Sequence, residues 1–241
     1  VTRQGTLELV GDGVTNPTAH GEAITNYTFL GTAIYLVGTD NCIIEYNVDN
    51  FKGGNCRVSN MMLTTNHTAS DQHGILISDR AMNFSLDRVT FMNITGYAWC
   101  WNMSVTVNSQ NISWENVAAF TVGGVIGSTA EPASGTRLNC TLFTVSNFNL
   151  DHQLSSVSPQ TYICDLRGMR EINLENFLLE GNSGGGLKRN EYMVFDCDGS
   201  ISITNLHLEG FDAFWPDTWL RFTNSSFWRR LSLMQTQRLK S

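Results

Sequence analysis

The sequence predicts an all-β fold, a right-handed, single-stranded parallel β-helix in which the chain winds into stacked coils. Three observations lead to this prediction: a segment recurs every 28–31 residues, apolar residues alternate within each copy, and an asparagine stands at the same place in nearly every copy. A fixed period of this length is typical of stacked-repeat architectures. The copies are CRVSNMML (56–63), FSLDRVTF (84–91), ISWENVAAF (112–120), FTVSNFNL (143–150), INLENFLL (172–179) and ISITNLHL (201–208).

Each copy is expected to form two short strands joined by a bend. Counted from the asparagine, apolar residues stand at −4, −2, +1 and +3, as in Ile172, Leu174, Phe177 and Leu179. Alternation within each half indicates a strand with one buried face, and the change of phase at the asparagine indicates a bend and excludes a helix. Asparagine tolerates the left-handed backbone of such a bend, and its amide can bond to the next coil. The bend positions are Asn60, Arg88, Asn116, Asn147, Asn176 and Asn205, and Arg88 is expected to interrupt the ladder.

A third strand upstream of each copy is expected to close the coil. Three strands in 28–31 residues fit a β-helix, whereas a leucine-rich repeat would be shorter and would carry a helix pattern. We therefore expect one domain over 1–241, with N-terminal coils at 1–55, regular coils at 56–210 and a C-terminal coil or cap at 211–241. The third-strand candidates are HGILIS (73–78), YAWCW (97–101), GGVIG (123–127), TYICDL (161–166), YMVFDC (192–197) and TWLRF (218–222).

Composition narrows the function classes. Charged residues make up 15% of the 241 residues and the net charge is −7, which disfavours nucleic acid or an anionic membrane surface as the partner. No apolar run reaches the roughly 18 residues of a membrane span. The six cysteines are scattered without metal-ligand spacing, so we expect buried free thiols and no cofactor or metal. The start lacks an initiator Met and a signal-peptide pattern, which indicates a processed chain or a fragment of a longer one.

The segments LELVGDG (7–13) and DQHGILISDRAMNFSLDRVTFMN (71–93), with the asparagine ladder, resemble the pectate-lyase-like right-handed β-helices. Within that superfamily the Ser-, Thr-, Asn- and Gly-rich, weakly charged sequence is most similar to bacteriophage tailspike and tail-fibre proteins. The resemblance implies a homotrimer in the phage tail that binds a bacterial surface polysaccharide, and in a hydrolytic version depolymerises it as a glycoside hydrolase. The alternatives are a non-catalytic adhesin or structural spike, and a secreted polysaccharide lyase or glycoside hydrolase that acts alone.

The first group of candidate catalytic residues is a column of acids four positions after the bend. Asp151, Glu180 and Glu209 occupy this position in three consecutive copies. Stacking in register would place neighbouring carboxylates about 5 Å apart, close to the separation found in retaining glycosidases. The alternative is an acidic stripe that is merely solvated.

A second group of candidates ends the third strand on adjacent coils. Asp165 and Asp196 would form a general acid and base pair if they stack, as acids beside this sheet do in the family that the chain resembles. The fuller residue set of polygalacturonase-like enzymes cannot be assembled here, and His73 followed by Gly74 adds only a weak signal. The alternative role is loop capping.

Tryptophans are the candidate carbohydrate-binding residues. Trp99 and Trp101 share one face of a strand, and Trp215 and Trp219 belong to an aromatic group near the C-terminus. Exposed aromatic rings can stack on the apolar faces of sugars. The same side chains could instead fill the core, cap the solenoid or bury a subunit interface. Trp114, at an inward −2 position, is expected in the core.

Overall fold

The computed structural model describes residues 7–13, 31–47, 55–66, 70–78, 81–102, 108–129, 139–153, 160–180, 191–196, 199–209 and 218–222. These residues form strands and turns without a helix, and none of them belongs to a helix able to cross a membrane. The strands are β1 (Leu7–Val10), β2 (Ala33–Leu36), β3 (Cys42–Tyr46), β4 (Cys56–Thr65), β5 (His73–Ile77), β6 (Met82–Trp101), β7 (Asn108–Ser128), β8 (Asn139–Gln153), β9 (Cys164–Arg167), β10 (Ile172–Glu180), β11 (Glu191–Asp196), β12 (Ile201–Glu209) and β13 (Thr218–Phe222).

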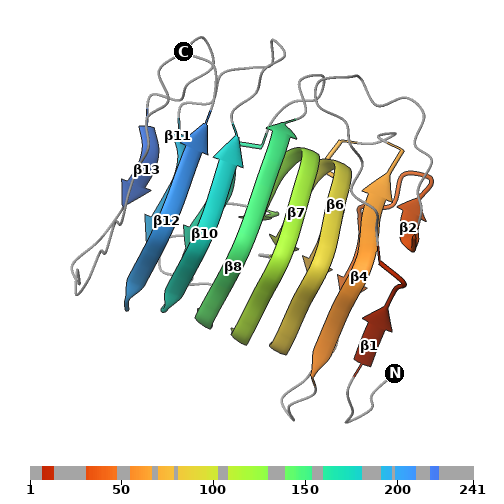
Figure 1. Ribbon diagram of the computed structural model, residues 1–241, viewed down its shortest axis with the longest axis horizontal. Helices are drawn as coiled ribbons and strands as arrows, with labels where there is room; N and C mark the ends of the chain where they lie inside the picture. The colour runs from red at the N-terminus through yellow and green to blue at the C-terminus, as the bar shows by residue number, and fades with distance from the viewer. Residues whose placement is uncertain are drawn as a thin grey trace.

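Parallel pairing between successive copies of the repeat builds the sheet. Strands β1, β4, β6, β7, β8, β10 and β12 lie side by side in that order (Figure 1). The register pairs Ile112 with Phe143, Phe143 with Ile172 and Ile172 with Ile201, in agreement with the repeat. The third strands pair separately, with β5 between β3 and β6 and with β9 between β7 and β11. The predicted all-β, parallel solenoid is confirmed, and it is consistent with a right-handed β-helix.

Left-handed bends explain why β6 and β7 continue through more than one side of the coil. In β6 the backbone has positive φ at Asn83 (53°), Arg88 (51°) and Asn93 (56°), each five residues after the previous one. In β7 the corresponding residues are Asn111 and Thr121, with Asn116 between them. All six predicted bend positions have positive φ, so the predicted bend is confirmed. The flanking bends were not predicted.

The asparagine ladder forms as expected over the later coils. The Nδ2 group of Asn205 donates to Oδ1 of Asn176 (2.8 Å), Asn176 donates to Asn147 (2.9 Å), and Asn147 donates to Asn116 (3.1 Å). Arg88 does not simply break the series, because its Nε donates to Oδ1 of Asn60 (2.5 Å). The expected interruption is therefore wrong on that side: Arg88 replaces the asparagine both in the bend and as a donor.

The core consists of the inward rows, and it is aromatic in the middle of the solenoid. Trp114 is buried as predicted and its ring lies 5.5 Å from Phe143 and 5.8 Å from Trp99 (centroid distances). Trp99 and Trp101 are also fully buried, with no exposed surface. Their expected role as sugar platforms is wrong, because a sugar cannot reach rings that face the interior of the coil.

The cysteines in the described residues are free thiols, as predicted. Cys56, Cys100, Cys140 and Cys164 are buried, and Cys42 is half-buried. Burial raises the pKa of Cys56 to about 11 and that of Cys140 to about 12, so these thiols stay protonated and pack as small apolar groups. Cys197 lies outside the described residues.

Candidate functional site

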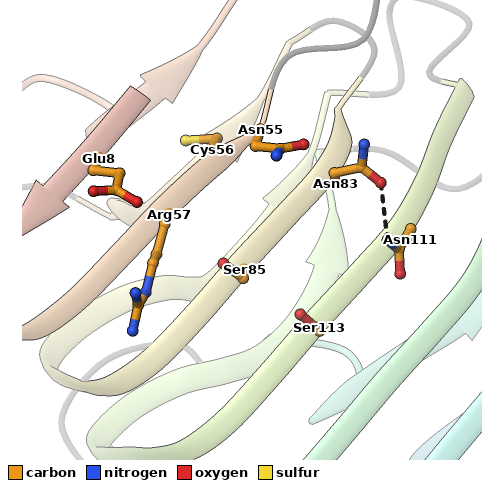
Figure 2. Close-up of a pocket in the computed structure, with 8 residues that line it drawn as sticks. All are labelled: Glu8, Asn55, Cys56, Arg57, Asn83, Ser85, Asn111 and Ser113. Atoms are coloured by element: carbon orange, nitrogen blue, oxygen red, sulfur yellow. Dashed lines mark hydrogen bonds between the residues drawn. The ribbon is translucent and has the colours of Figure 1, made fainter. Parts of the chain in front are cut away.

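A polar groove of about 500 Å³ crosses the outward side of β1, β4, β6 and β7. Figure 2 shows its side chains on neighbouring strands, with a hydrogen bond joining Asn83 to Asn111. Amides, hydroxyls and one pair of opposite charges make up most of its lining. The lining residues are Glu8, Asn55, Cys56, Arg57, Asn83, Ser85, Asn111 and Ser113.

Strand register arranges these side chains in rows. Glu8 pairs with Arg57, Arg57 with Ser85, and Ser85 with Ser113, one residue from each of four strands. These residues alternate with the buried ones, so they point out of the coil. Two positions earlier on β6 and β7, Asn83 and Asn111 stand at left-handed bends, and the Nδ2 group of Asn111 donates to Oδ1 of Asn83 (2.8 Å). The groove is a direct consequence of stacking equivalent repeat positions.

An ion-pair network holds the charged end of the groove. Nη2 of Arg57 and Nη2 of Arg88 each lie 2.8 Å from the same oxygen of Asp87, Oδ2. The Asp87 side chain is only 12% exposed, whereas that of Arg57 is 42% exposed. The carboxylate therefore fixes the Arg57 guanidinium through one nitrogen and shares its single charge between Arg57 and Arg88. The other nitrogens of Arg57 remain able to donate to a ligand.

The remaining charges on this face are acidic. Glu115 is the register partner of Asp87 on β7 and is exposed, and Glu175 is exposed on β10. Glu8 is exposed at the end of the groove. None of these three carboxylates has an ion-pair partner among the residues that the structure describes. With Asp87, these carboxylates outnumber Arg57 and Arg88, so an anionic ligand on this face would meet a net negative charge.

A second polar group, around the start of β5, is used by the fold itself. Nδ1 of His73 accepts a hydrogen bond from the backbone N–H of Tyr97 (3.0 Å), and the two rings stack at 6.2 Å. Burial lowers the pKa of His73 to about 4, against an opposing influence of Asp71. The imidazole is therefore neutral at pH 7, and its proton is on Nε2. Asp71 accepts a hydrogen bond from Nε2 of Gln160 (2.6 Å), which ties distant parts of the chain together.

The expected pair of Asp165 and Asp196 is not in register. Asp165 pairs with Val194 on β11, and Asp196 pairs with Arg167 on β9. Arg167 also donates to both carboxylate oxygens of Asp165, from Nε to Oδ1 (2.8 Å) and from Nη2 to Oδ2 (2.6 Å). The premise that these aspartates stack on adjacent coils is therefore wrong. Asp196 lies two residues beyond Val194, the register partner of Asp165. Asp165 serves to hold Arg167.

For the column of acids four positions after the bend, the structure describes the backbone register. Glu180 and Glu209 are register partners on β10 and β12, and Asp151 pairs with Phe120 on the other side of its strand. The side chains of these three acids lie outside the described residues. Their catalytic role therefore stays a prediction that rests on the backbone register.

The C-terminal tryptophans give less information. Trp219 lies on β13, but its side chain is outside the described residues, as is the whole of Trp215. In the part of the chain that the structure describes, no group of three or more His, Cys, Asp or Glu side chains could hold a metal ion.

Sequence reasoning missed the groove, although a signal for it was present. Asn83 and Asn111 each stand five residues before a bend, and Ser85 and Ser113 each stand three before it. Alignment of the repeats by their outward positions shows both rows, but asparagine and serine are common throughout the chain, so the rows stand out less than the acids and tryptophans. No family model, curated protein or solved structure matches the chain. The class of fold, a parallel β-solenoid, is therefore established by the structure, and the likeness to tailspikes rests on the sequence pattern.

Proposed function

We propose that the protein is a receptor-binding β-helix of the tailspike or tail-fibre type, which binds a bacterial surface polysaccharide. The observation that carries the proposal is the groove over β4, β6 and β7, where amides and hydroxyls repeat in register across the coils. Such groups both donate and accept hydrogen bonds, as sugar hydroxyls do. The virion location and the homotrimer are part of the proposal and derive from the sequence resemblance.

A modest affinity of a single groove follows from its chemistry. No aromatic residue is among the described residues that line the groove. Binding by these residues depends on hydrogen bonds that replace bonds to water, each worth about 0.5–1.5 kcal/mol net. Three grooves in a homotrimer would engage one cell surface together and raise the avidity without new contacts. This gives the trimer a physical role in attachment.

Binding to purified glycans tests the proposal. A panel of capsular polysaccharides and lipopolysaccharides is immobilised, and the protein is passed over each surface. We expect saturable binding to at least one, with competition by the same polysaccharide in solution. The proposal is rejected if the protein binds none of these polysaccharides and also fails to bind the intact bacteria from which the polysaccharides were prepared.

Sedimentation tests the assembly. The chain has a mass of 26.8 kDa, and the proposal predicts a species of three times that mass. A monomer at all concentrations would favour the alternative of a secreted lyase or hydrolase that acts alone.

A hydrolytic version is the second candidate, and the register of Glu180 with Glu209 favours it. Neighbouring parallel strands lie about 4.8 Å apart, near the carboxylate separation of about 5–5.5 Å in retaining glycosidases. Incubation with the bound polysaccharide should then release oligosaccharides, and Glu180→Gln should abolish the release. The control is Glu175→Gln, an exposed acid on the same strand outside the column. If glycan binds and no fragments appear, the protein is a non-catalytic adhesin.

A further inference from the structure

We infer that the groove takes an uncharged, linear polysaccharide that runs across β4, β6 and β7, with one sugar opposite each coil. This inference rests on the proposed function and deepens it, because it gives the place, the direction and the charge class of the ligand. Three features of the groove carry it: the repetition of its polar side chains, their chemistry, and the distribution of charge around them.

Repetition sets the direction of the ligand. The pairs Asn83 with Ser85 and Asn111 with Ser113 occupy equivalent positions on adjacent strands, and Arg57 stands at the position equivalent to Ser85 and Ser113. Adjacent strands lie about 4.8 Å apart, so the same set of donors and acceptors recurs at that interval along the solenoid axis. A ligand that uses all of them must itself repeat at a similar interval, as the sugars of an extended glycan do.

Chemistry selects hydroxyl groups. Ser85 and Ser113 are half-buried, and their hydroxyls can donate and accept at once. The amides of Asn83 and Asn111 bond to each other through one oxygen and one hydrogen, so each retains further hydrogen-bonding capacity on the outward side. Carboxylate or phosphate groups only accept hydrogen bonds, so they would use the donors of these side chains and leave the acceptors unused. The hydroxyl groups of a polysaccharide can use both the donors and the acceptors.

The charge around the groove disfavours an acidic polymer. Arg57 and Arg88 share the single carboxylate of Asp87. Glu8, the register partner of Arg57, and Glu115, the register partner of Asp87, add two further carboxylates, so acids outnumber arginines around the groove. The whole chain carries a net charge of −7. Like charges placed side by side at a binding surface oppose association, so a uronate- or phosphate-bearing glycan is disfavoured relative to a neutral one.

The charge class is tested on one polymer in two forms. A neutral capsular polysaccharide that binds the protein is oxidised at its primary hydroxyls to uronates, which leaves the linkages unchanged. We expect the oxidised polymer to bind at least about tenfold more weakly by calorimetry, equivalent to about 1.4 kcal/mol, and part of the loss to return at high salt. Equal or tighter binding of the oxidised form overturns the charge class.

The place is tested with matched tyrosine substitutions. Ser113→Tyr and Ser85→Tyr each fill the groove, and Ser202→Tyr places the same side chain at the equivalent outward position on β12, outside it. Both groove variants should lose at least about tenfold in affinity with an unchanged melting temperature, and Ser202→Tyr should bind like the wild type. If both groove variants are folded and still bind, the glycan site lies elsewhere; this inference then fails while the proposed function stands. If the wild type binds no surface polysaccharide, both fail.

Discussion

Two outward faces of the same coils differ in how their polar side chains are used. On the face crossed by β4, β6 and β7, Ser85 and Ser113 point outward and are half-buried. On the face formed by β5 and the end of β6, His73 and Tyr97 are buried. The serine hydroxyls of the first face are partly accessible to solvent, whereas Nδ1 of His73 accepts a hydrogen bond from the backbone of Tyr97.

Glycines make the second face possible. An added Cβ at Gly127 would overlap the ring of Tyr97, and one at Gly96 would overlap the imidazole of His73. The rings can lie flat on the sheet only because these positions lack a side chain. The comparison shows that a titratable residue in this solenoid is not a site by virtue of its chemistry alone. Its burial and its partners decide whether it can meet a ligand.

The largest expected effect comes from the core that both faces share. Trp99→Ala removes a fully buried indole, and such substitutions cost about 3–5 kcal/mol. We expect a loss of this size in chemical denaturation. If the variant instead kept its stability and lost glycan binding, Trp99 would be a ligand platform and the assignment of the two faces would be wrong.

The buried face should give the protein an acid sensitivity. The pKa of His73 is lowered from 6.5 to about 4 in the folded protein, so the unfolded chain takes up this proton first as the pH falls below 6.5. The stability that neutral His73 gives the fold is fully retained above pH 6.5. It is lost progressively toward pH 4, by about 3 kcal/mol of unfolding free energy at most.

Denaturation of the wild type and His73→Asn between pH 7 and pH 4 isolates this contribution from that of the carboxylates. The wild type should lose more stability than the variant over the interval. Parallel pH profiles would mean that His73 is accessible to protons in the folded state.

The ladder at the bend is expected to matter less than the core. Asn176→Ala removes two ladder hydrogen bonds and leaves an alanine at a φ of 50°, at a combined cost of about 2 kcal/mol. Asn176→Gly keeps the bend without strain and should lose only about 1 kcal/mol. Equal losses for the two variants would show that backbone strain has no part in the effect.

The smallest effect on stability is expected in the groove. Ser113→Ala removes a hydroxyl from a half-buried outward position, and surface substitutions of this kind stay within about 0.5 kcal/mol. Gly127→Ala, on the buried face, should cost about 1–3 kcal/mol because the new methyl group meets the Tyr97 ring. If the serine were the costlier of the two, the groove would be a structural element.

The fold could be predicted because its signal is repeated. Asn116, Asn147, Asn176 and Asn205 recur with the same apolar positions around them, so each copy supports the others. The bend at Asn83 and Asn111 was harder to see, because the equivalent position is Leu142 in the next copy. A residue such as Leu142 that adopts the left-handed conformation cannot be recognised from its residue type in the sequence.

The candidate site was predicted less well, for two physical reasons. Both faces of the third strand are buried, as Ala98 and Trp99 show, so alternation gave no indication that Trp99 points inward. The offset of Asp165 from Asp196 depends on strand register, which the ends of the strands do not reveal. The +4 acids were aligned correctly for Glu180 and Glu209 because they sit in the strongest part of the repeat.

The most direct test of the account is an experimental structure of the protein with an oligosaccharide from a surface polysaccharide that it binds. The account predicts the glycan along the solenoid axis over β4, β6 and β7, with sugar hydroxyls within hydrogen-bonding distance of Ser85 and Ser113. A glycan bound over Glu180 and Glu209, or anywhere else with the groove left open, would contradict it.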